Sequence, residues 1–572
     1  MPNKVNRRQF LKYAATSLMV AEYGCSHTSK QLSSTPQPER IQLTDITQKA
    51  GIRFDAINGH SSHRYFIETM GSGCAFIDYD SDGWQDILLL SGHPLPGSFS
   101  TKTSPSLRLF HNNRDGTFTD VTTSMGLANS HFFAYGVAVG DFDNDGYPDF
   151  YVSCALGPGR LFQNDKGKGF RDITSDAGIS DDRGLWGTSC CWLDYNNDGH
   201  LDLFICNYVK YRSLKDDMPC KLGNGVDTYC VPNAFPPTHC VLYKNNGNGT
   251  FTDVSAASGI ASAMAKGLGV IVWDYDNDGF PDIFVACDTV PSLVFHNNGN
   301  GTFEEVGLQS GFATNTTGGP HSGMGIDITT IDKAAYIVLG NYTNAETCMY
   351  REVAPGLFQN EGGSDGIGPP SQNNVGFGAF FADFGNRGIR DVLVVNGHVQ
   401  DNVHTYHPDQ HYRELPLLYS GDGSGRFSVQ PPVGPLGVPI VARGAAKSNL
   451  FNDGRLVTLV TTNGGPAYLW QNSGKLGNWI GVQLVGTKSN RSGLGTKVTV
   501  TTADGSSQLD ICRSGSSYLS ASDLRLHFGL GSNSAPVTIT LQWPSGLKET
   551  HTNVAVNKIW NLTEGQDAAV TV

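Results

Sequence analysis

Charged residues are scarce in this sequence of 572 residues, in which Asp, Glu, Lys and Arg together make up 16%. Outside the N-terminus, no apolar run approaches the roughly 20 residues that a membrane-spanning helix needs, which argues against a transmembrane receptor. Glycine is abundant instead, with 69 residues. Few charges and many glycines predict a large all-β architecture of short strands and tight turns.

Contiguous catalytic motifs are also missing. No GxSxG elbow, P-loop, HExxH or dinucleotide fingerprint occurs in a context that would support it. The formal net charge of −13 gives no case for nucleic acid as a partner. An enzyme is not excluded, because histidine and carboxylate sites that the fold assembles need no contiguous signature.

The first 25 residues predict a signal for export. Arg7 and Arg8 are followed by QFLK and a short apolar segment, as in twin-arginine signals. Cys25 is a candidate lipid-anchor cysteine, although the residues before it fit a lipobox badly, so a cleaved soluble form stays open. Residues 26–40 are rich in Ser, Thr, Pro and Gln and predict a linker. We therefore expect a periplasmic, cell-surface or extracellular protein.

Four acidic strings recur along the chain as FIDYDSDGWQDIL, GDFDNDGYPDF, WLDYNNDGHLDLF and WDYDNDGFPDIF. Their first aspartates are Asp78, Asp141, Asp194 and Asp274, which makes a repeat of roughly sixty residues with insertions. Three weaker units follow, beginning GMGIDITTIDK, GFGAFFADFGN and ARGAAKSNLFN, which keep the strand pattern while losing carboxylates.

Seven units predict a seven-bladed β-propeller over residues 41–474. An open β-solenoid is the alternative, but each unit is too long for one solenoid coil. Alternating strands without acidic loops then predict a separate small C-terminal β domain over residues 475–566.

The acidic strings have the chemistry of a calcium loop. Carboxylates on alternate residues converge on one point, a glycine permits the backbone reversal, and hard oxygen ligands of this number favour Ca²⁺. An EF-hand is excluded, because its glutamate at position 12 and its flanking helices are absent. We expect about four Ca²⁺ ions in hairpin loops, with side-chain ligands at positions 1, 3, 5 and 9 and a backbone carbonyl at position 7. The predicted ligands are Asp78, Asp80, Asp82, Trp84 and Asp86; Asp141, Asp143, Asp145, Tyr147 and Asp149; Asp194, Asn196, Asp198, His200 and Asp202; and Asp274, Asp276, Asp278, Phe280 and Asp282.

These repeats resemble the FG-GAP/VCBS repeats of integrin α-subunit propellers, whose loops have the same D-x-D-x-D-G-x-x-D form. The C-terminal strings SNRSGLGTKVTV and GSSYLSASDLRLHFGLG resemble the ASPIC/UnbV domain, found in cartilage acidic protein and bacterial relatives. The resemblance implies a calcium-binding, secreted or surface-associated module for adhesion or recognition. Asp383 and Asp391 keep the ends of one further motif, but Gly385 and Arg387 replace central ligands, so we expect no calcium there.

Two histidine-bearing segments are the candidates for chemistry beyond calcium. GHVQDNVHTYHPDQHYRE contains His398, Asp401, His404 and His407, and GHSSHRYFIET contains His63 and Glu68. The spacing of the first matches no zinc signature, and a polar surface loop or a strand-end hydrogen-bond network explains both. In the long insertion, Cys220, Cys230 and Cys240 predict at least one disulfide.

The predicted function is therefore a calcium-binding recognition module for a protein, glycan or small-molecule ligand. The alternative is a calcium-dependent enzyme, a hydrolase or a cyclase of secondary metabolism, whose site lies on one propeller face.

Overall fold

Strands dominate the computed structural model, which describes residues 40–180, 183–223, 225–567 and 569–571. The signal predicted for residues 1–25, including Cys25, lies outside the described residues, as does the linker up to residue 39. None of the helices in the described ranges is long and apolar enough to cross a membrane.

Seven four-stranded antiparallel sheets, here called blades, follow one another in the described part of residues 43–472. They are blade 1 with β2 (Cys74–Ile77), β3 (Asp86–Leu90), β4 (Leu107–Asn112) and β5 (Phe118–Asp120); blade 2 with β6 (Ala134–Gly140), β7 (Asp149–Cys154), β8 (Arg160–Asn164) and β9 (Phe170–Asp172); blade 3 with β10 (Leu185–Leu193), β11 (Asp202–Lys210), β14 (Val241–Asn245) and β15 (Phe251–Asp253); blade 4 with β16 (Gly267–Trp273), β17 (Asp282–Cys287), β18 (Leu293–Asn297) and β19 (Phe303–Glu305); blade 5 with β20 (Ile326–Ile331), β21 (Ala334–Leu339), β22 (Cys348–Ala354) and β23 (Leu357–Asn360); blade 6 with β24 (Gly376–Ala382), β25 (Asp391–Asn396), β26 (Leu417–Gly421) and β27 (Phe427–Val429); and blade 7 with β28 (Ala442–Ser448), β29 (Val457–Thr462), β30 (Tyr468–Asn472) and β1 (Leu43–Asp45).

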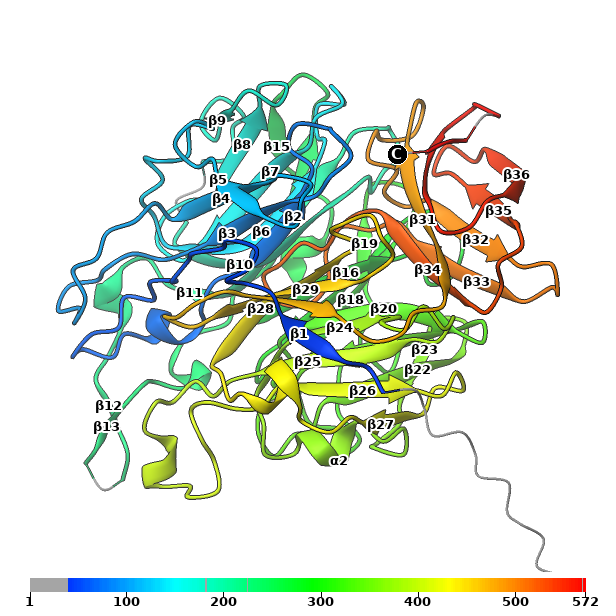
Figure 1. Cartoon of the computed structure of the whole chain (residues 1–572). Helices are drawn as coiled ribbons and strands as arrows, with labels where there is room; N and C mark the ends of the chain where they lie inside the picture. The colour runs from blue at the N-terminus through cyan, green and yellow to red at the C-terminus, as the bar shows by residue number, and fades with distance from the viewer. Residues whose placement is uncertain (1–39, 181–182, 224, 568, 572) are drawn as a thin grey trace, which may run out of the picture. The chain divides into compact units, whose positions relative to one another are not determined.

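The blades are arranged in a closed ring (Figure 1). The first strand of each of blades 2 to 7 contacts the first strand of the blade before it, and β28 returns to contact β2. The N-terminal strand β1 completes blade 7, with Leu43 opposite Asn472, so the two ends of the ring are held by one sheet. Closure of this kind removes exposed sheet edges, as in a β-propeller. The all-β prediction is confirmed, and the arrangement is propeller-like.

Inner strands such as β6 and β24 are buried along their whole length. They approach one another so closely that small residues are required at some positions. A Cβ on Gly136 would lie 2.3 Å from the carbonyl oxygen of Thr188 in blade 3. This is why the inner strands of the repeats are rich in glycine and alanine.

Two more four-stranded sheets form the C-terminal domain, drawn in orange to red in Figure 1. One contains β34 (Leu526–Gly531), β31 (Asn478–Val485), β37 (Ile559–Thr563) and β38 (Val570–Thr571), and the other contains β33 (Ser507–Ile511), β32 (Lys497–Thr501), β35 (Val537–Gln542) and β36 (Lys548–Val554). Ile480 and Trp543 of this domain belong to the same buried apolar cluster as Phe142 and Trp192 of blades 2 and 3. The domain and the ring therefore share a continuous core.

The insertion between β11 and β14 carries a small hairpin of β12 (Cys220–Lys221) and β13 (Asp227–Thr228), which lies away from the C-terminal domain in Figure 1. Cys220 and Cys230 form a disulfide, which confirms the prediction of a pair in this insertion, whereas Cys240 is a buried free thiol. Short helices complete the described elements: η1 (Phe66–Thr69), η2 (Leu214–Asp216), η3 (Pro232–Ala234), η4 (Ile260–Ser262), α2 (Gly368–Ser371), η5 (Val403–Thr405) and η6 (Gly434–Gly437).

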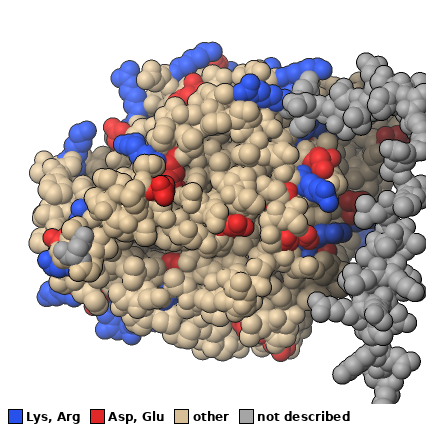
Figure 2. Space-filling view, turned by 90° about the horizontal axis from the view of Figure 1, so that it is seen from below, with Lys and Arg blue, Asp and Glu red and all other residues tan. Residues whose placement is uncertain are grey.

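On the face seen in Figure 2, the described Lys and Arg residues are interspersed with Asp and Glu over a surface that is mostly neither. On this face, therefore, neither sign of charge forms a continuous patch.

Candidate functional site

Each acidic loop joins the innermost strand of a blade to the next strand. In blade 2 the loop begins at Asp141, directly after β6, and ends at Asp149, the first residue of β7. Asp141 accepts hydrogen bonds from the backbone N–H groups of Asp145 at 3.0 Å and Gly146 at 2.8 Å. Gly146 has φ 96°, which only glycine adopts readily, so it permits the reversal that wraps the loop around its carboxylates.

Carboxylate oxygens converge within the loops of blades 1, 2 and 4. The groups whose ligand atoms lie within 4.8 Å of one another are Asp78, Asp80 and Asp82; Asp80, Asp86 and His111; Asp141, Asp143 and Asp149; and Asp274, Asp276 and Asp282. In blade 3 the residue at position 3 of the loop is Asn196. Its amide oxygen replaces one carboxylate, and Asp194, Asp198 and Asp202 keep the others. The position-7 residues Trp84, Tyr147, His200 and Phe280 each donate a backbone N–H to the carboxylate two residues earlier, at 2.8 to 3.1 Å.

The energetics of these carboxylates fit a cation. Burial raises the pKa of Asp78, Asp141 and Asp194 to about 7 in each case, because a carboxylate removed from water resists ionisation. Asp80 Oδ1 and Asp274 Oδ1 are buried without a hydrogen-bond partner. Hard oxygen donors in this number match the coordination preference of Ca²⁺, and no softer sulfur ligand belongs to these groups.

In blades 1, 2 and 4, one further side chain, which sequence reasoning missed, reaches the loop from the third strand of the same blade. His111 Nδ1 lies 3.2 Å from Asp86 Oδ1, and His296 Nδ1 lies 3.1 Å from Asp282 Oδ1. In blade 2, Gln163 donates to Asp143 Oδ2 at 2.7 Å. A signal was available, because these residues occupy one position in the recurring strings LFHNN, LFQND and VFHNN.

Blade 6 carries a protein cation at the equivalent place. The Arg387 guanidinium contacts the Asp391 carboxylate and donates to Ser420 Oγ at 3.2 Å. Asp383 accepts from the backbone N–H of Arg387 at 2.8 Å. The acidic ends of this degraded motif are thus already bonded to arginine and to backbone N–H groups.

The C-terminal domain rests on the face that carries the acidic loops. Ser492 Oγ accepts from the backbone N–H of Asp141 at 3.0 Å, and Asn144 Oδ1 accepts from that of Arg491 at 2.8 Å. Arg525 donates to the Gly83 carbonyl at 3.2 Å in the loop of blade 1. The conformation of the loops therefore determines the surface on which the domain docks.

A segment of the same domain, residues 515–522, passes among the inner strands at the centre of the ring. Ser517 pairs with Ile326 of blade 5, Leu519 bonds to Val137 of blade 2 and to Ser189 of blade 3, and Ala521 pairs with blade 1 at Cys74. We call residues 515–522 the plug. A Cβ on Gly73 would lie 1.7 Å from the Leu519 carbonyl oxygen, so this glycine makes room for the plug.

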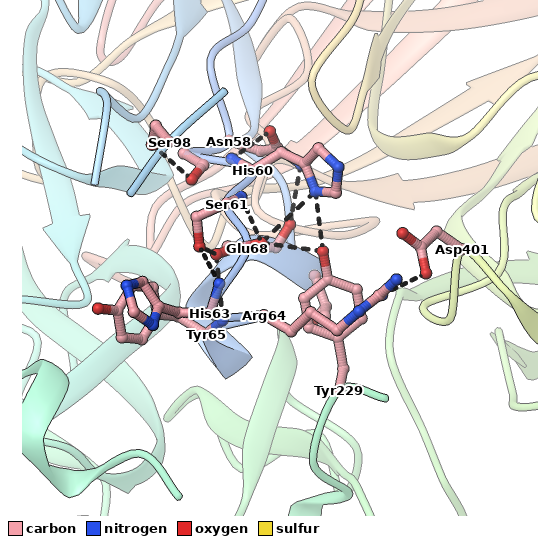
Figure 3. A network of polar contacts seen from close by, with 12 residues as sticks. Asn58, His60, Ser61, His63, Arg64, Tyr65, Glu68, Ser98, Tyr229 and Asp401 are labelled. Atoms are coloured by element: carbon pink, nitrogen blue, oxygen red, sulfur yellow. Dashed lines mark hydrogen bonds and ion pairs between the residues drawn. The ribbon is translucent and has the colours of Figure 1, made fainter. Parts of the chain in front are cut away.

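On the other side of the ring, a fully buried carboxylate, that of Glu68, organises a polar network (Figure 3). Glu68 accepts from Ser61 Oγ and from Tyr229 Oη, the latter at 2.9 Å. His60 Nδ1 lies 3.1 Å from Tyr229 Oη, and the hydrogen bond with Glu68 raises the pKa of His60. Arg64 extends from the same segment to the Asp401 carboxylate at 2.5 Å.

The network thus joins residues from two of the segments that the sequence singled out. Glu68 and Asp401 are connected through Tyr229 and Arg64: Tyr229 Oη donates to Glu68, and the Arg64 guanidinium, which binds Asp401, lies 5.3 Å from the Tyr229 ring centroid. Tyr229, in the insertion, was missed because it has no motif and lies far from both segments in sequence.

The histidines of these segments are dispersed. His398 is buried, accepts from the backbone N–H of Gln400 at 2.9 Å, and has its pKa lowered to about 4 by burial. His63, His404 and His407 are exposed. Within the described ranges, each candidate metal group contains carboxylates of an acidic loop, one of them together with His111 of β4, and none includes a histidine of residues 398–411.

Comparisons with known proteins agree with this division of the chain. The FG-GAP-like repeat family matches residues 78–152, 227–285 and 274–333, and the ASPIC and UnbV family matches residues 486–569. Cartilage acidic protein 1 of Mus musculus is 25% identical over 537 residues, which cover 88% of this chain and 76% of that protein. The Homo sapiens protein of the same name is 28% identical over 181 residues, which cover 31% of this chain and 24% of that protein.

Solved structures resemble the ring only loosely. An Agrocybe aegerita lectin that recognises non-reducing terminal N-acetylglucosamine has a TM-score of 0.37 and 17% identity, covering 63% of this chain and 80% of its own. Trypanosoma rangeli sialidase has a TM-score of 0.32 and 10% identity, covering 64% of this chain and 57% of its own. These scores are too low to carry an inference about ligands. The family matches and the homologous relative together establish that the chain consists of FG-GAP-like repeats followed by a C-terminal ASPIC/UnbV domain, the architecture of cartilage acidic protein 1, to which it is homologous.

Proposed function

We propose that this protein is an exported recognition module whose acidic loops bind about four Ca²⁺ ions. The observation that carries the proposal is the convergence of carboxylates, most of them at least partly buried, in the loops of blades 1, 2 and 4, two of which contain an oxygen that has no hydrogen-bond partner. Residues at positions 1, 3, 5, 7 and 9 of each loop would hold the ion. The ion would supply positive charge that offsets the repulsion among these carboxylates.

Calcium in these loops has a structural consequence beyond each hairpin. Because Ser492, Arg491 and Arg525 of the C-terminal domain bond to the loops, ordering them stabilises the docked domain and, through it, the plug. A binding module needs a rigid scaffold, and here the scaffold is a ring whose face opposite the acidic loops is ordered. The twin-arginine pattern at Arg7 and Arg8 supports export, where millimolar calcium is available.

Metal analysis tests the proposal. Residues 26–572, folded in millimolar calcium and dialysed with trace zinc, manganese and iron, should retain about four calcium ions and no stoichiometric transition metal. Hydrogen exchange across residues 515–522 should then accelerate on chelation. Retention of no calcium, or exchange that chelation leaves unchanged, contradicts the proposed role of the loops.

The second candidate function is acid–base catalysis on the face that carries Glu68. The observation that favours it is a chain of hydrogen bonds from half-exposed His60 through Tyr229 Oη to the buried Glu68 carboxylate. Such a chain can hold and relay a proton. The test is turnover of p-nitrophenyl esters or glycosides. Turnover that is lost in His60→Gln and kept in His63→Gln would support catalysis. Absence of turnover, or equal turnover in both variants, would rule out this use of His60 for these substrates.

A further inference from the structure

A cavity of about 310 Å³ opens on the face where the inner strands begin, whereas the acidic loops follow the ends of those strands. Its apolar lining comes from four blades and includes Phe66, Met70, Leu268, Met324 and Phe377. Because residues of several inner strands or their approaches meet here, the cavity lies at the axis of the ring. We call it the axial pocket.

The plug supports this pocket from behind. The Tyr518 ring packs against Phe377 with ring centroids 4.9 Å apart, and Tyr518 Oη donates to the Met70 carbonyl at 3.2 Å. Tyr518 is fully buried. The depth of the axial pocket is therefore limited by a residue of the C-terminal domain.

One wall of the axial pocket is polar. Asp288 is 8% exposed and accepts from Tyr208 Oη at 2.6 Å, and Ser322 also hydrogen-bonds to its side chain. These contacts use about half of the bonds that a carboxylate can accept. Asp288 can thus receive one further O–H or N–H donor from a ligand.

A buried amine accompanies this carboxylate. Lys266 is 3% exposed, and its Nζ donates to the Pro232 carbonyl at 2.8 Å, with Asn233 Oδ1 at 3.3 Å and Thr289 Oγ1 at 3.4 Å. Lys266 does not itself line the pocket, but it bonds to the lining residues Pro232, Asn233 and Thr289, so its positive charge lies close to the negative charge of Asp288. Neither a cationic nor an anionic ligand is favoured there, because it would be desolvated without a compensating charge.

The rim is fixed before any ligand arrives. Val231 and Pro232 lie directly after the Cys220–Cys230 disulfide and line the pocket. Gln400, which also lines the pocket, holds the residue before the disulfide: it accepts from the Tyr229 N–H at 3.0 Å and donates to the Tyr229 carbonyl at 2.9 Å. Thr289 has φ 61°, a conformation that β-branched residues rarely adopt. Preformed pockets of this kind lose little entropy on binding.

We propose that the axial pocket binds a small, uncharged aromatic molecule that carries one hydroxyl or amino donor directed at Asp288. Its volume is at the lower end of the roughly 300–1,000 Å³ typical of ligand pockets, so the ligand is small. The rings of Phe66, Phe377 and Tyr208 and the thioethers of Met70 and Met324 favour a flat aromatic body. The inference deepens the proposed recognition function, but it does not require calcium.

Fluorescence titration with 2-naphthol and with naphthalene tests this inference, using calcium-saturated protein of residues 26–572. We expect one equivalent of 2-naphthol to bind at least tenfold more tightly than naphthalene, which has the same rings and no donor. Asp288→Asn keeps the size of the side chain but removes its charge, and it should reduce the preference to threefold or less. Equal affinity for the two probes, or a preference that Asp288→Asn leaves unchanged, overturns the role of Asp288.

Filling the pocket tests its location. Val399→Trp, in the half-buried lining, should abolish binding of both probes, and Val231→Trp at the exposed rim should do the same if the first variant folds poorly. Val438→Trp is the matched control, because Val438 is 52% exposed and does not line the pocket. No saturable binding to the wild type, or binding that both filling variants preserve, overturns the inference. Wild-type protein that retains about four calcium ions while failing to bind either probe would leave the calcium proposal standing.

Discussion

The ammonium group of Lys497 in the C-terminal domain lies 2.8 Å from Asp274 Oδ2, the first carboxylate of the acidic loop in blade 4. Lys497 also donates to Asn277 Oδ1 at 2.7 Å. In the other three loops the first aspartate accepts from the backbone N–H four residues later, as Asp141 does from Asp145, but no such bond is made by Asp274. A protein cation thus occupies part of the coordination sphere that a metal would use.

We therefore predict that the loop of blade 4 is the weakest of the four calcium sites. At about 4 Å in a water-like medium, one unit of charge is worth about 1 kcal/mol, or about fivefold in affinity, and the partial burial of this pair increases that value. Lys497→Met should strengthen the weakest site by at least this factor in a calorimetric titration. Lys488→Met, which removes a charge outside that loop, is the control, and an unchanged weakest site in Lys497→Met would contradict the competition.

Calcium should stabilise the fold through individual loop ligands. Sites with dissociation constants of about 0.1–1 mM add ~0.4–1.4 kcal/mol each at millimolar calcium. Asp143→Ala should therefore lower the melting temperature in calcium and have little effect in chelator, where the half-buried Asp143 accepts bonds from Gln163 and from the backbone N–H of Asp145. Exposed Asp409→Ala serves as the matched control in differential scanning calorimetry. Equal destabilisation of Asp143→Ala with calcium and with chelator would mean that the loop of blade 2 is not a calcium site.

Export should depend on the paired arginines. Replacement of Arg7 and Arg8 by Lys keeps both charges but removes the twin-arginine signature, so the protein should accumulate in the cytoplasm of an expressing bacterium. Cell fractionation with immunoblotting measures this, and Lys4→Arg is the charge-preserving control. Unchanged export of the double variant would contradict the prediction that Arg7 and Arg8 belong to a twin-arginine signal.

The sequence predicted those features that are local and repeated. The spacing of Asp78, Asp141, Asp194 and Asp274 predicted the blades, because each loop is an autonomous turn with its own hydrogen bonds. Closure of the ring by β1 was not predicted, although LTD at Leu43 matches the FTD strings of the outermost strands in blades 1 and 3. The LTD string predicts that an outermost strand begins at Leu43, but it does not predict which strand this one pairs with.

Other features carried no local signal. Tyr518 sits in a non-periodic segment, and its contacts are with Met70 and Phe377, which both lie far earlier in the chain. The axial pocket likewise joins side chains whose only common property is their place in the ring. Sequence reasoning can propose that a propeller has a functional face. Which residues meet on that face depends on how the ring of blades closes, and no local pattern shows this.

Acid should destabilise the protein through its buried histidines. Burial lowers the pKa of both His321 and His398 to about 4, against an ordinary value of about 6.5. Between these pH values the unfolded chain binds more protons than the folded one, so stability falls as pH decreases from about 6.5 to about 4 and is unaffected by these groups above that window. Each histidine contributes at most about 1.4 kcal/mol per pH unit there.

His398→Gln should make this pH dependence shallower in chemical denaturation at pH 7 and pH 5. The glutamine can retain the acceptor for Gln400 N–H but does not titrate. Exposed His404→Gln is the control. An identical loss of stability between the two pH values in wild type and His398→Gln would show that His398 is not a titrating buried group.

The plug should contribute to stability by filling the centre of the ring. Tyr518 is fully buried, its ring packs on Phe377, and its Oη bonds to the Met70 carbonyl. Tyr518→Ala removes an aromatic side chain from a close-packed site and should lower the free energy of unfolding by about 3–5 kcal/mol. Tyr518→Phe keeps the ring and removes only one hydrogen bond, at a cost of about 1 kcal/mol. Urea denaturation compares the two variants, and a Tyr518→Ala protein as stable as Tyr518→Phe would show that the ring contributes nothing at the axis.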